Sequence, residues 1–364
     1  MSISHRAERV RAELGDLDAL LVSDLTNIRW LTGFTGSNGW VVLGHDSLTL
    51  VTDGRYGHQA EQQMEAAGVS GQVVVGVNGA LVQTIADACA PHSRIGFEAA
   101  HVSFQSHGQY AAAISGELAP VVGLVEAQRR RKDPEEIEAM ARACAIADQA
   151  LGDVAPMLAD GLTEAQVRNL LEIRMRELGA SGPSYETIVA TGPHNAALPH
   201  HRPTATLIEQ GHTVIIDVGA LVDGYHSDMT RSFVVGEPSP QQAELYELVL
   251  RAQVAGVDAV RPGQRTADID AVCRDIIADA GYGDWFTHGT GHGVGLLIHE
   301  DPYLSRVADA TLQVGDVVTV EPGVYHVGFG GIRVEDLVVV TSDGCRVLTA
   351  FPKDSPCPQS PPTT

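Results

Sequence analysis

The chain has 364 residues, of which 44% are hydrophobic and 19% charged, and its formal net charge is −22. These proportions are typical of a globular protein, and the length exceeds that of a usual single hydrophobic core, so two domains are expected. So negative a charge argues against nucleic acid and against an anionic membrane surface as partners, because their phosphates would be repelled.

Neither a signal peptide nor a membrane-spanning segment is expected. The first twenty residues contain no apolar core of signal-peptide length, and no later stretch is apolar enough to span a bilayer. The five cysteines are scattered, odd in number and form no CxxC pair, which indicates reduced thiols rather than a disulfide framework. A cytoplasmic protein is therefore expected.

Helix-like and strand-like stretches alternate over residues 1–125, which predicts a small α/β domain with its own core. Helices are expected at Ser4–Leu14, Arg55–Ala67, Leu81–Ala90 and Ser103–Ile114. Strands are expected at Ala19–Val22, Trp40–Leu43, Leu48–Thr52, Gln72–Val77, Arg94–Phe97 and Leu118–Val122.

Two segments of this first domain could be functional. The three glycines of TGFTGSNG could bind phosphate, but no GxxxxGK[ST] or strand–GxGxxG–helix context surrounds them, so a turn-rich loop is the better interpretation. Asp53, Arg55 and Tyr56 in TDGRY could line a site. An exposed turn that starts a helix is at least as good an interpretation of TDGRY.

Residues 126–133 are expected to form a linker between the domains. They include four consecutive basic residues, and in so acidic a chain a solvated linker, or a lid on an acidic surface, is favoured over a phosphate site. Asp133, Pro134 and Glu136 then predict a helix start. Asp is a good N-cap, Pro suits the first turn, and Glu three residues after the cap can close a capping box.

Residues 134–350 are expected to form the second domain, in which helix pairs and strands alternate. Its expected helices run from Pro134 to about Ala159, from Thr163 to Gly179, and over Gln241–Val260 and Thr266–Ala280. Its expected strands are Ser184–Ala190, a strand ending at Asp217, Val317–Glu321 and Ile332–Val340. The tail FPKDSPCPQSPPTT, residues 351–364, is rich in Pro and Ser, which predicts disorder.

Residues 213–233, TVIIDVGALVDGYHSDMTRSF, contain two acids, Asp217 and Asp228, eleven positions apart. The first half predicts a buried strand and Gly219–Gly224 a reversal, so a hairpin would bring the two carboxylates together on adjacent strands. Two unpaired carboxylates in an apolar sheet repel each other and are costly to desolvate, and a cation between them removes that cost. The pair therefore indicates half of a metal site.

Three downstream residues complete a candidate ligand set: His292 in GTGHGVG, Glu321 in VEPG and Glu335 in the strand-like Ile332–Val340. Four carboxylates and one imidazole suit one divalent ion or, more readily, two, and four negative charges balance two M²⁺ ions. Taken singly, each acid could face solvent and the histidine could belong to a loop. Together they indicate a site, because each lies beside glycine or inside an apolar strand.

The motifs ALPHHRP, IIDVGALVDGYHSDMTRSF, GTGHGVGLLIHE, VEPGVY and GIRVEDLVVV, in this order, resemble the aminopeptidase P and Xaa-Pro dipeptidase (prolidase) family of pita-bread-fold metallopeptidases. The resemblance covers nearly the whole chain, because family members carry a smaller α/β domain with sequences similar to LTGFTGSNG and TDGRY. It implies an α+β fold, in which a creatinase-like N-terminal α/β domain precedes a pita-bread catalytic domain.

The resemblance also implies how the ligand set is used. Asp217 would bind one ion, His292 and Glu321 the other, and Asp228 and Glu335 would bridge both. The ions would be manganese, with zinc or cobalt as alternatives, and the protein would be a homodimer.

Further residues would contact the substrate by resemblance. His200 would lie beside it, His299 would hydrogen-bond the peptide carbonyl, and His288 would line the pocket on the proline side. His201 is an additional histidine that is counted among the substrate-binding candidates, although its role is open. Arg333 either orients the metal carboxylates or lies on a surface face of its strand.

These roles predict hydrolysis of the Xaa-Pro bond at the N-terminus of peptides or in dipeptides. Water held between two cations loses a proton near neutral pH, and the resulting hydroxide would attack the scissile carbonyl with Glu321 as general base. The Xaa-Pro bond has no N–H, so recognition would rely on carbonyl, amine and ring shape.

Three alternatives share this fold. A methionine aminopeptidase uses the same ligand set and is disfavoured by the long N-terminal domain. A creatine-type amidinohydrolase usually lacks the intact metal set, and a non-catalytic binding protein has no need of it. The complete set of five residues therefore argues against the last two.

Overall fold

The structure, a computed structural model, describes residues 3–77 and 79–357 of the chain. It consists of two compact units, one ending at Arg129 and the other starting at Arg130. The change from one unit to the other falls inside residues 126–133, the segment expected to be a linker. Each unit has a hydrophobic core of its own.

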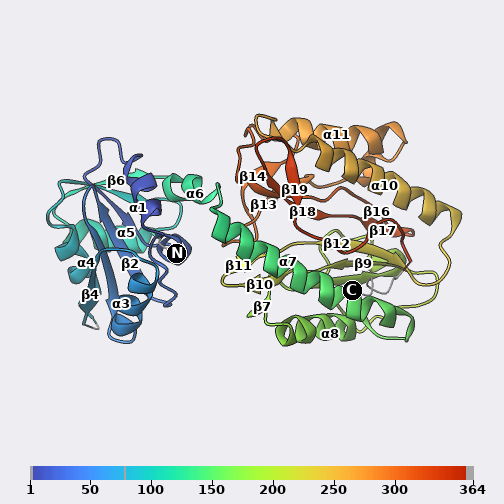
Figure 1. Cartoon of the computed structure of the whole chain (residues 1–364), viewed down its shortest axis with the longest axis horizontal. Helices are drawn as coiled ribbons and strands as arrows, with labels where there is room; N and C mark the ends of the chain where they lie inside the picture. Colours follow the sequence, from blue (N-terminus) through green and yellow to red (C-terminus); the bar gives the residue numbers. More distant parts are fainter. Residues whose placement is uncertain (1–2, 78, 358–364) are drawn as a thin grey trace. The chain divides into compact units, whose positions relative to one another are not determined.

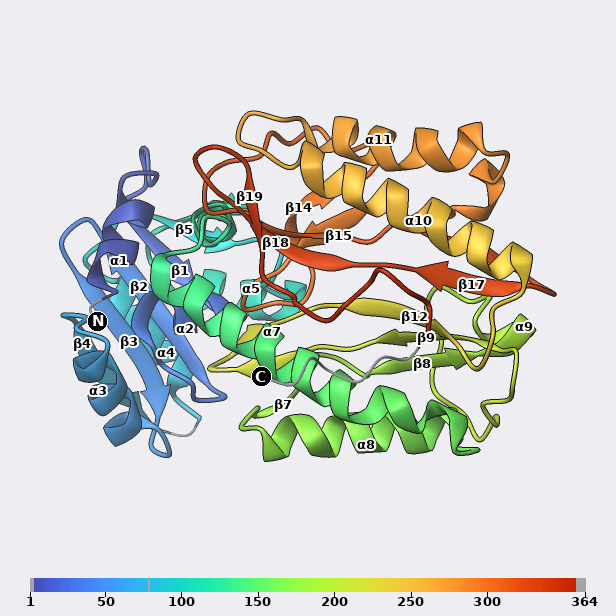
Figure 2. The ribbon, with the colours of Figure 1, turned by 45° about the vertical axis from the view of Figure 1, so that its right-hand side comes forward.

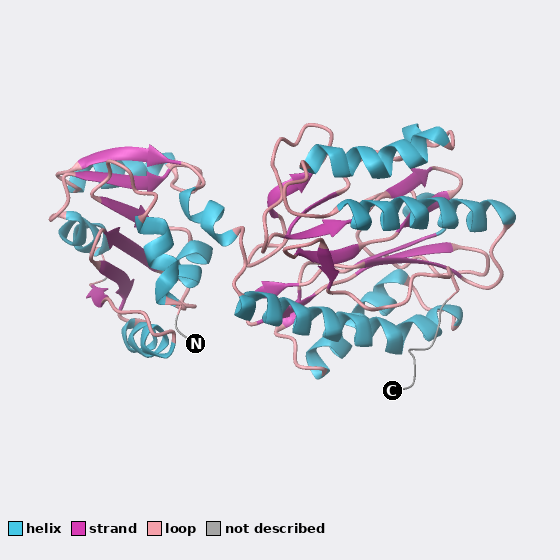
Figure 3. Cartoon of the chain, turned by 45° about the horizontal axis from the view of Figure 1, so that its top comes forward, coloured by secondary structure: helices cyan, strands magenta, loops and turns pink. Residues whose placement is uncertain are grey.

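The first unit is built on one mixed sheet with strand order β4-β3-β2-β1-β5-β6 (Figures 1 and 3). Its strands are β1 (Ala19–Val22), β2 (Gly39–Gly44), β3 (Leu48–Asp53), β4 (Gln72–Gly76), β5 (Arg94–Glu98) and β6 (Glu117–Val121). Its helices are α1 (Ser4–Arg11), α2 (Leu25–Thr32), α3 (Gly57–Ala66), α4 (Leu81–Cys89), α5 (Phe104–Ala113) and α6 (Leu124–Arg129). All the strands expected from the sequence are present.

Helix α2 differs from the expectation, which left these residues unassigned. Asp24 caps its start, because the Asp24 side chain accepts a hydrogen bond from the Thr26 N–H at 2.7 Å. Gly33, with φ of 76°, ends it. An N-cap Asp and a left-handed Gly are both readable signals, but the eight residues between them are rich in β-branched and aromatic side chains, which weakens a helix prediction.

TDGRY forms a structural turn at the end of β3. The Asp53 carboxylate is buried and accepts hydrogen bonds from the Arg55 side chain, from the Asn38 side chain at 2.7 Å and from the Arg55 backbone at 2.9 Å. These bonds hold the pKa of Asp53 below its usual range. The contacts favour the structural interpretation of this segment.

The expectation of a solvated segment is wrong for three of the four basic residues at 129–132, because only Arg131 among them is exposed. Arg129 ends helix α6 and is buried, as is Lys132. Arg130 pairs with Asp316 at 2.6 Å, and Lys132 pairs with Glu300 at 2.7 Å. The acidic partners are far away in the sequence, so a local charge pattern could not reveal them.

In the second unit, strands lie between two helix pairs, with α7 and α8 on one side and α10 and α11 on the other (Figures 1 and 2). The helices are α7 (Pro134–Val154), α8 (Glu164–Glu177), α9 (Gly192–Asn195), α10 (Pro240–Ala259) and α11 (Thr266–Asp279), with short 3-10 turns at Ala155–Ala159 and Gly283–Trp285. The expected capping box of α7 is confirmed: Glu136 accepts a hydrogen bond from the Asp133 N–H at 2.8 Å.

The strands of this unit form several small sheets, with orders β11-β10-β7, β12-β9-β8, β14-β13-β15-β18-β19 and β16-β17. The strands in the first half are β7 (Gly182–Pro183), β8 (Ile188–Thr191), β9 (Thr213–Asp217), β10 (Ala220–Val222), β11 (Tyr225–His226) and β12 (Thr230–Val234). Those in the second half are β13 (Gly291–Gly293), β14 (Glu300–Leu304), β15 (Val317–Val320), β16 (Gly323–His326), β17 (Gly330–Arg333), β18 (Asp336–Val340) and β19 (Cys345–Val347).

Two buried clusters hold the strands against the helices. Leu151 of α7 and Val167 of α8 share one cluster with Ile216 of β9. Val249 of α10 shares the other with Val338 of β18. Strands buried between helix layers place any polar side chain at their ends in a dry environment, which raises the cost of leaving it unpaired.

Two expected strands differ from the structure. The strand predicted at Ser184–Ala190 begins only at Ile188, so Tyr185 lies in the preceding loop. The strand predicted at Ile332–Val340 is interrupted at Val334 and Glu335, because the chain passes there from the two-stranded sheet of β17 to the five-stranded sheet of β18.

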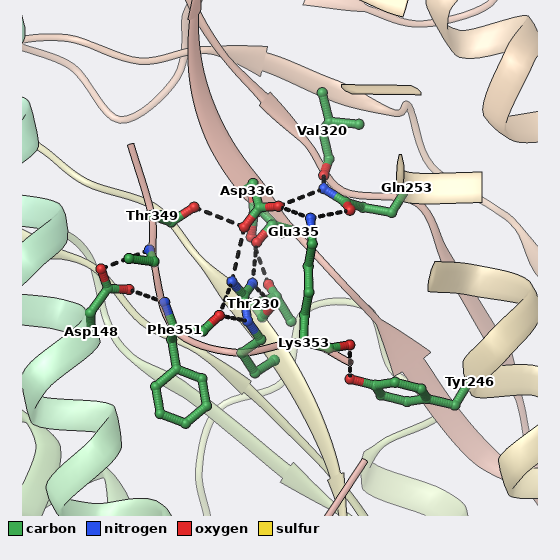
Figure 4. Close-up of polar contacts among 12 residues, drawn as sticks. Asp148, Thr230, Tyr246, Gln253, Val320, Glu335, Asp336, Thr349, Phe351 and Lys353 are labelled. Carbon is green, nitrogen blue, oxygen red and sulfur yellow. Dashed lines mark hydrogen bonds and ion pairs between the residues drawn. The ribbon is translucent and has the colours of Figure 1, made fainter. Parts of the chain in front are cut away.

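The prediction of a disordered tail is wrong for residues 351–357, while residues 358–364 lie outside the described residues. Phe351 is only 5% exposed, and its N–H donates to Asp148 at 3.0 Å. The Lys353 ammonium donates to Asp336 and, at 2.7 Å, to Gln253 (Figure 4). Phe351 and Lys353 therefore order this segment through their partners. The Pro and Ser content of the tail, on which the prediction rested, does not reveal such contacts.

Asp336 remains ionised within this buried cluster. Burial acts to raise its pKa, but the charges of Arg231 and Lys353 outweigh burial and hold the pKa at about 2. A buried ion pair of this kind is costly to break by removing one partner, because the other charge is left without compensation.

Two further observations bear on the sequence expectations. Within the part of the chain that the structure covers, none of the helices combines the length and apolar character needed to cross a membrane. All five cysteines carry free thiols, and Cys89, Cys144 and Cys273 are buried.

Candidate metal centre

The carboxylates of Asp217 and Asp228 lie close together as expected, but the chain between them does not form the single hairpin that was expected. Asp217 ends β9 and pairs in register with Thr230 of β12, two residues after Asp228. The intervening residues form a separate hairpin, β10–β11, whose tip is Asp223 with φ of 50° and Gly224 with φ of 79°. Asp228 therefore lies in the connection before β12 and not within a strand.

Close chain crossings bring the ligand-bearing segments together, and glycine permits them. A Cβ on Gly219 would lie 2.0 Å from the Ser227 carbonyl oxygen, and one on Gly291 would lie 2.0 Å from the Thr319 carbonyl oxygen. The first contact joins the two halves of the Asp217–Asp228 connection. The second presses β13, which carries His292, against β15, which leads into Glu321.

Glu335 is held at the break between β17 and β18 by Thr230. The Glu335 N–H donates to the Thr230 carbonyl at 3.1 Å, and the Thr230 hydroxyl donates to Glu335 Oε2 at 2.6 Å. Both the main chain and the carboxylate of Glu335 are thereby fixed against β12, beside Asp228.

One cavity of about 390 Å³ gathers the five residues of the predicted ligand set. Ligand atoms of Asp228, His292 and Glu335 lie within 4.8 Å of one another, and all three residues are buried. His292 Nε2 lies 3.5 Å from Asp228 Oδ2 and 3.5 Å from Glu321 Oε1. The set that is scattered over more than a hundred positions of sequence is therefore contiguous in space.

The electrostatics of the cluster favour the binding of a cation. Burial, and then the charge of Asp217, raises the pKa of Asp228 well above its usual range, and burial together with Asp228 does the same for Glu335. A divalent cation would reverse both effects. Several oxygen donors and one imidazole fit such an ion, so these residues form a candidate metal site.

His292 is prepared as a neutral ligand. Its Nδ1 lies 3.1 Å from the Gly293 carbonyl, a contact in which Nδ1–H donates and the Nε2 lone pair is left to face Asp228 and Glu321. Metal-binding histidines usually donate their second ring N–H to a carbonyl or carboxylate in this way. Burial lowers the pKa of His292, which favours the uncharged ring that a metal requires.

Three predicted substrate histidines line the same cavity: His200, His288 and His299. The His299 ring lies edge-on to the His292 ring at 4.3 Å, and burial lowers the pKa of His299. His288 Nε2 lies 3.0 Å from the Tyr325 hydroxyl, which holds the His288 ring at the cavity wall.

His201 is not among the residues that line the cavity, which corrects its assignment to substrate binding. It is buried, and its Nε2 lies 3.0 Å from the carboxylate of Glu164 in α8. Glu164 also accepts hydrogen bonds from the Thr191 N–H and from Thr204. His201 therefore anchors its loop to α8, a role that depends on a partner far away in sequence.

Arg333 is buried at the site, so the surface alternative is excluded: it is only 2% exposed. It donates to Asp217 Oδ2 at 2.6 Å, to the Thr230 hydroxyl at 2.9 Å and to the Tyr325 hydroxyl at 2.8 Å. Burial opposes its charge, yet Tyr325, Asp217 and other acids raise the pKa of Arg333 well above its usual value. A permanent cation thus orients Asp217.

Tyr185 is a site residue that the sequence interpretation missed. Its hydroxyl donates to Asp228 Oδ1 at 2.5 Å and also to Asp217. Burial, then the charges of Asp217 and Asp228, raises the pKa of Tyr185 well above its usual value, so the hydroxyl keeps its proton and remains a donor. A tyrosine next to a strand-like run usually belongs to the core, so its sequence context carries no functional signal.

Replacing Tyr185 with phenylalanine tests its contribution to the site. Tyr185→Phe keeps the ring and removes the donor shared by Asp217 and Asp228, so affinity for Mn²⁺ is expected to fall by roughly 10- to 100-fold. Equilibrium dialysis measures that affinity directly. Tyr303→Phe, a cavity tyrosine without these bonds, serves as the matched control and should bind Mn²⁺ like the parent.

The comparisons with known proteins show the family of the chain. Residues 138–342 match metallopeptidase family M24, and residues 6–131 match the creatinase/prolidase N-terminal domain. A pita-bread fold with an acidic site of this composition is typical of a metallopeptidase, and an N-terminal domain precedes it in this chain. The chain belongs to family M24, in the aminopeptidase P and prolidase group, and the expected α+β architecture is confirmed.

Similar proteins cover nearly the whole chain. An uncharacterized peptidase of Bacillus subtilis (strain 168) is 42% identical over 96% of this chain and 99% of its own length. The Xaa-Pro dipeptidase from Bacillus anthracis superposes with a TM-score of 0.93 at 37% identity, covering 97% of this chain and 99% of that one. The X-Pro aminopeptidase from Thermotoga maritima MSB8 gives 0.88 at 32% identity, covering 95% and 99%.

Proposed function

We propose that the chain hydrolyses the Xaa-Pro bond at the N-terminus of peptides or in dipeptides, using two divalent ions. The observation that carries the proposal is the convergence of Asp228, His292 and Glu335, with ligand atoms within 4.8 Å of one another, in a cavity that Asp217 and Glu321 also line. Its similarity to an Xaa-Pro dipeptidase and to an X-Pro aminopeptidase supports this substrate class.

In this proposal Asp217 would hold one ion, His292 and Glu321 would hold the other, and Asp228 and Glu335 would be shared by both. The oxygen-rich set favours manganese, with zinc or cobalt as alternatives. When bound, the ions lower the pKa of a shared water and polarise the scissile carbonyl.

The side chains of the protein do the remaining work. Glu321, itself a proposed ligand, accepts the proton of the attacking water and delivers it to the leaving proline nitrogen. His299 donates a hydrogen bond to the carbonyl oxygen as negative charge develops there. His288, held by Tyr325, forms the wall for the proline ring, and His200 flanks the substrate on the exposed side of the cavity.

A second cavity beside the site bears on the length of peptide that the site accepts. A groove of about 500 Å³ shares His288, Gly289 and Ser305 with the site cavity and continues between residues 283–289 and 305–307. Residues that follow proline would leave through this groove, because it opens at the His288 wall. The proposal is therefore that tripeptides are accepted as well as dipeptides.

Release of proline from Ala-Pro and cleavage of Ala-Pro-Ala, each with and without Mn²⁺, test the function. We expect Mn²⁺-stimulated cleavage of both, with the tripeptide cleaved at least as fast. Failure to cleave either peptide while two metal ions are bound would favour a non-catalytic binding protein.

A variant pair tests the groove. Val307 is 93% exposed and lines only the groove, so Val307→Trp should lower kcat/KM for Ala-Pro-Ala severalfold and leave Ala-Pro unchanged. Val327→Trp, at a valine that is 66% exposed and lines neither cavity, is the control and should leave both substrates unchanged. Equal loss on both peptides for Val307→Trp would refute the proposed exit path.

A cytoplasmic homodimer completes the proposal. The dimer rests on the resemblance, and the scattered, unpaired cysteines support the cytoplasmic location. Light scattering coupled to size-exclusion chromatography checks the dimer, and a monomeric mass for the active enzyme would contradict it.

A further inference from the structure

The residues Thr349–Cys357, here called the C-terminal strap, lie beyond the stretch 138–342 that matches the peptidase family. Two of their side chains nevertheless donate hydrogen bonds to a residue next to Glu335 in the chain. Figure 4 shows Thr349 and Lys353 pointing toward Asp336, the residue after Glu335. The strap therefore contacts the backbone neighbour of a proposed bridging ligand.

Several bonds fix Asp336. The Lys353 ammonium donates to its carboxylate, and the Thr349 hydroxyl donates to Oδ1 at 2.8 Å. Gln253 donates to Oδ2 at 3.0 Å and accepts from Lys353 at 2.7 Å. The Asp336 carboxylate is thus surrounded by donors, and two of them come from the strap.

Arg231 connects the strap to Glu335 itself. It donates to the Phe351 carbonyl from Nε at 3.0 Å and from Nη2 at 2.7 Å. Its Nη2 also donates to Asp336 Oδ1 at 2.9 Å, and its Nη1 donates to the carbonyls of Thr230 and Glu335. The Arg231 guanidinium therefore joins the strap to both Glu335 and Asp336.

The strap is itself anchored at several points. Asp148 of α7 accepts hydrogen bonds from the Ala350 and Phe351 N–H groups, at 2.8 and 3.0 Å. The Tyr246 hydroxyl of α10 donates to the Lys353 carbonyl at 2.9 Å. Because it is fixed to helices on both sides of the strands, the strap can resist movement of Asp336 and Arg231.

We propose that the C-terminal strap is a positioning element of the metal site, with Lys353 as its principal residue. Lys353 holds Asp336, the Phe351 carbonyl holds Arg231, and these two hold the main chain of Glu335, whose carboxylate then faces Asp228 and His292. Without the Lys353 charge, Asp336 is a buried anion with one cation fewer, and its relaxation displaces Glu335. The inference rests on the proposed metal site.

The test is the affinity of the full chain for Mn²⁺, measured by equilibrium dialysis or calorimetry without any substrate. Lys353→Met keeps the length of the side chain and removes the charge, so the affinity is expected to fall by roughly 10- to 100-fold, the range typical of residues that orient metal ligands. Lys353→Arg retains the charge and should restore most of the parental affinity. Affinity of Lys353→Met within about threefold of the parent would overturn the proposal.

Two further variants separate positioning from general stability. Val167 of α8 is buried in the hydrophobic core, so Val167→Ala opens a cavity there. This variant should lower the melting temperature without changing Mn²⁺ affinity. An equal loss of affinity in Val167→Ala would also overturn the proposal. Thr349→Val removes one bond to Asp336 with almost no change of shape, and it should weaken Mn²⁺ binding even where Lys353→Met fails to fold.

The same measurements distinguish failure of the strap from failure of the proposed function. A parent chain that binds no Mn²⁺, Zn²⁺ or Co²⁺ contradicts the metal site and with it the strap. A parent that binds Mn²⁺ tightly, with Lys353→Met and Thr349→Val binding equally well, contradicts only the strap.

Discussion

Asp228→Ala is expected to reduce hydrolysis of Ala-Pro by more than about 100-fold, because losing a bridging ligand costs more than losing a residue that merely orients one. Asp228 lies within ligand distance of His292 and Glu335, and Tyr185 holds its carboxylate toward Asp217. Its removal takes one ligand from each of the two proposed ions. The measurement is kcat/KM in the presence of excess Mn²⁺.

Thermal melting separates this loss from unfolding. Ligands that bind only the folded chain raise its melting temperature, so Mn²⁺ should stabilise the parent and have little effect on Asp228→Ala. Without metal, the variant should be about as stable as the parent, because a buried, repelled carboxylate has been removed. Asp258→Ala, at an exposed position in α10, is the control. Residual activity of Asp228→Ala above about a tenth of normal would count against a bridging role.

His299→Ala is expected to lower kcat by roughly 100- to 1000-fold, the cost typical of removing one donor to a developing oxyanion. His299 lines the cavity beside His292, with the two rings 4.3 Å apart. It belongs to no proposed metal ligand set, so Mn²⁺ affinity should remain close to that of the parent. His194→Ala, at an exposed histidine outside the cavity, is the matched control.

The distribution of the His299 effect between kcat and KM identifies its role. A donor that acts only as charge develops lowers kcat and leaves KM nearly unchanged. A rise in KM at constant kcat would instead show that His299 binds substrate and transition state equally well. Loss of Mn²⁺ affinity would assign it to the metal site.

The convergence of the five candidate ligands could be predicted from the sequence because each residue conflicts with its own surroundings. An acid at the end of the apolar run leading to Asp217, or after the run leading to Glu321, is costly to bury and so points to a partner. His292 lies between two glycines, Gly291 and Gly293. Local conflicts of this kind are visible without any coordinates.

Other features depend on partners that are remote in sequence. The sequence suggests that His201 belongs to the site, but in the structure its ring contacts Glu164. The sequence suggests that Tyr185 belongs to the core, but its hydroxyl donates to two carboxylates of the site. The basic run at 129–132 and the tail from Phe351 were misinterpreted for the same reason. Composition describes the average of a segment, whereas one buried contact, such as Lys353 with Asp336, decides its structure.

The β10–β11 hairpin is an intermediate case. Asp223–Gly224 is a standard two-residue turn signal with both residues at positive φ. The sequence predicts one long reversal between Asp217 and Asp228, whereas in the structure this turn closes a separate hairpin. The convergence of the two acids was predicted correctly because β9 and β12 still pair, whatever the connection between them does.

Anomalous X-ray scattering at the manganese edge, from crystals of the Mn²⁺-loaded chain, tests the metal site most directly. Two peaks about 3.5–4 Å apart are expected, with Asp228 and Glu335 touching both. Asp217 should contact one peak, and His292 and Glu321 the other. Peaks located away from these five side chains, or none at all in an enzyme that cleaves Ala-Pro, would contradict the account.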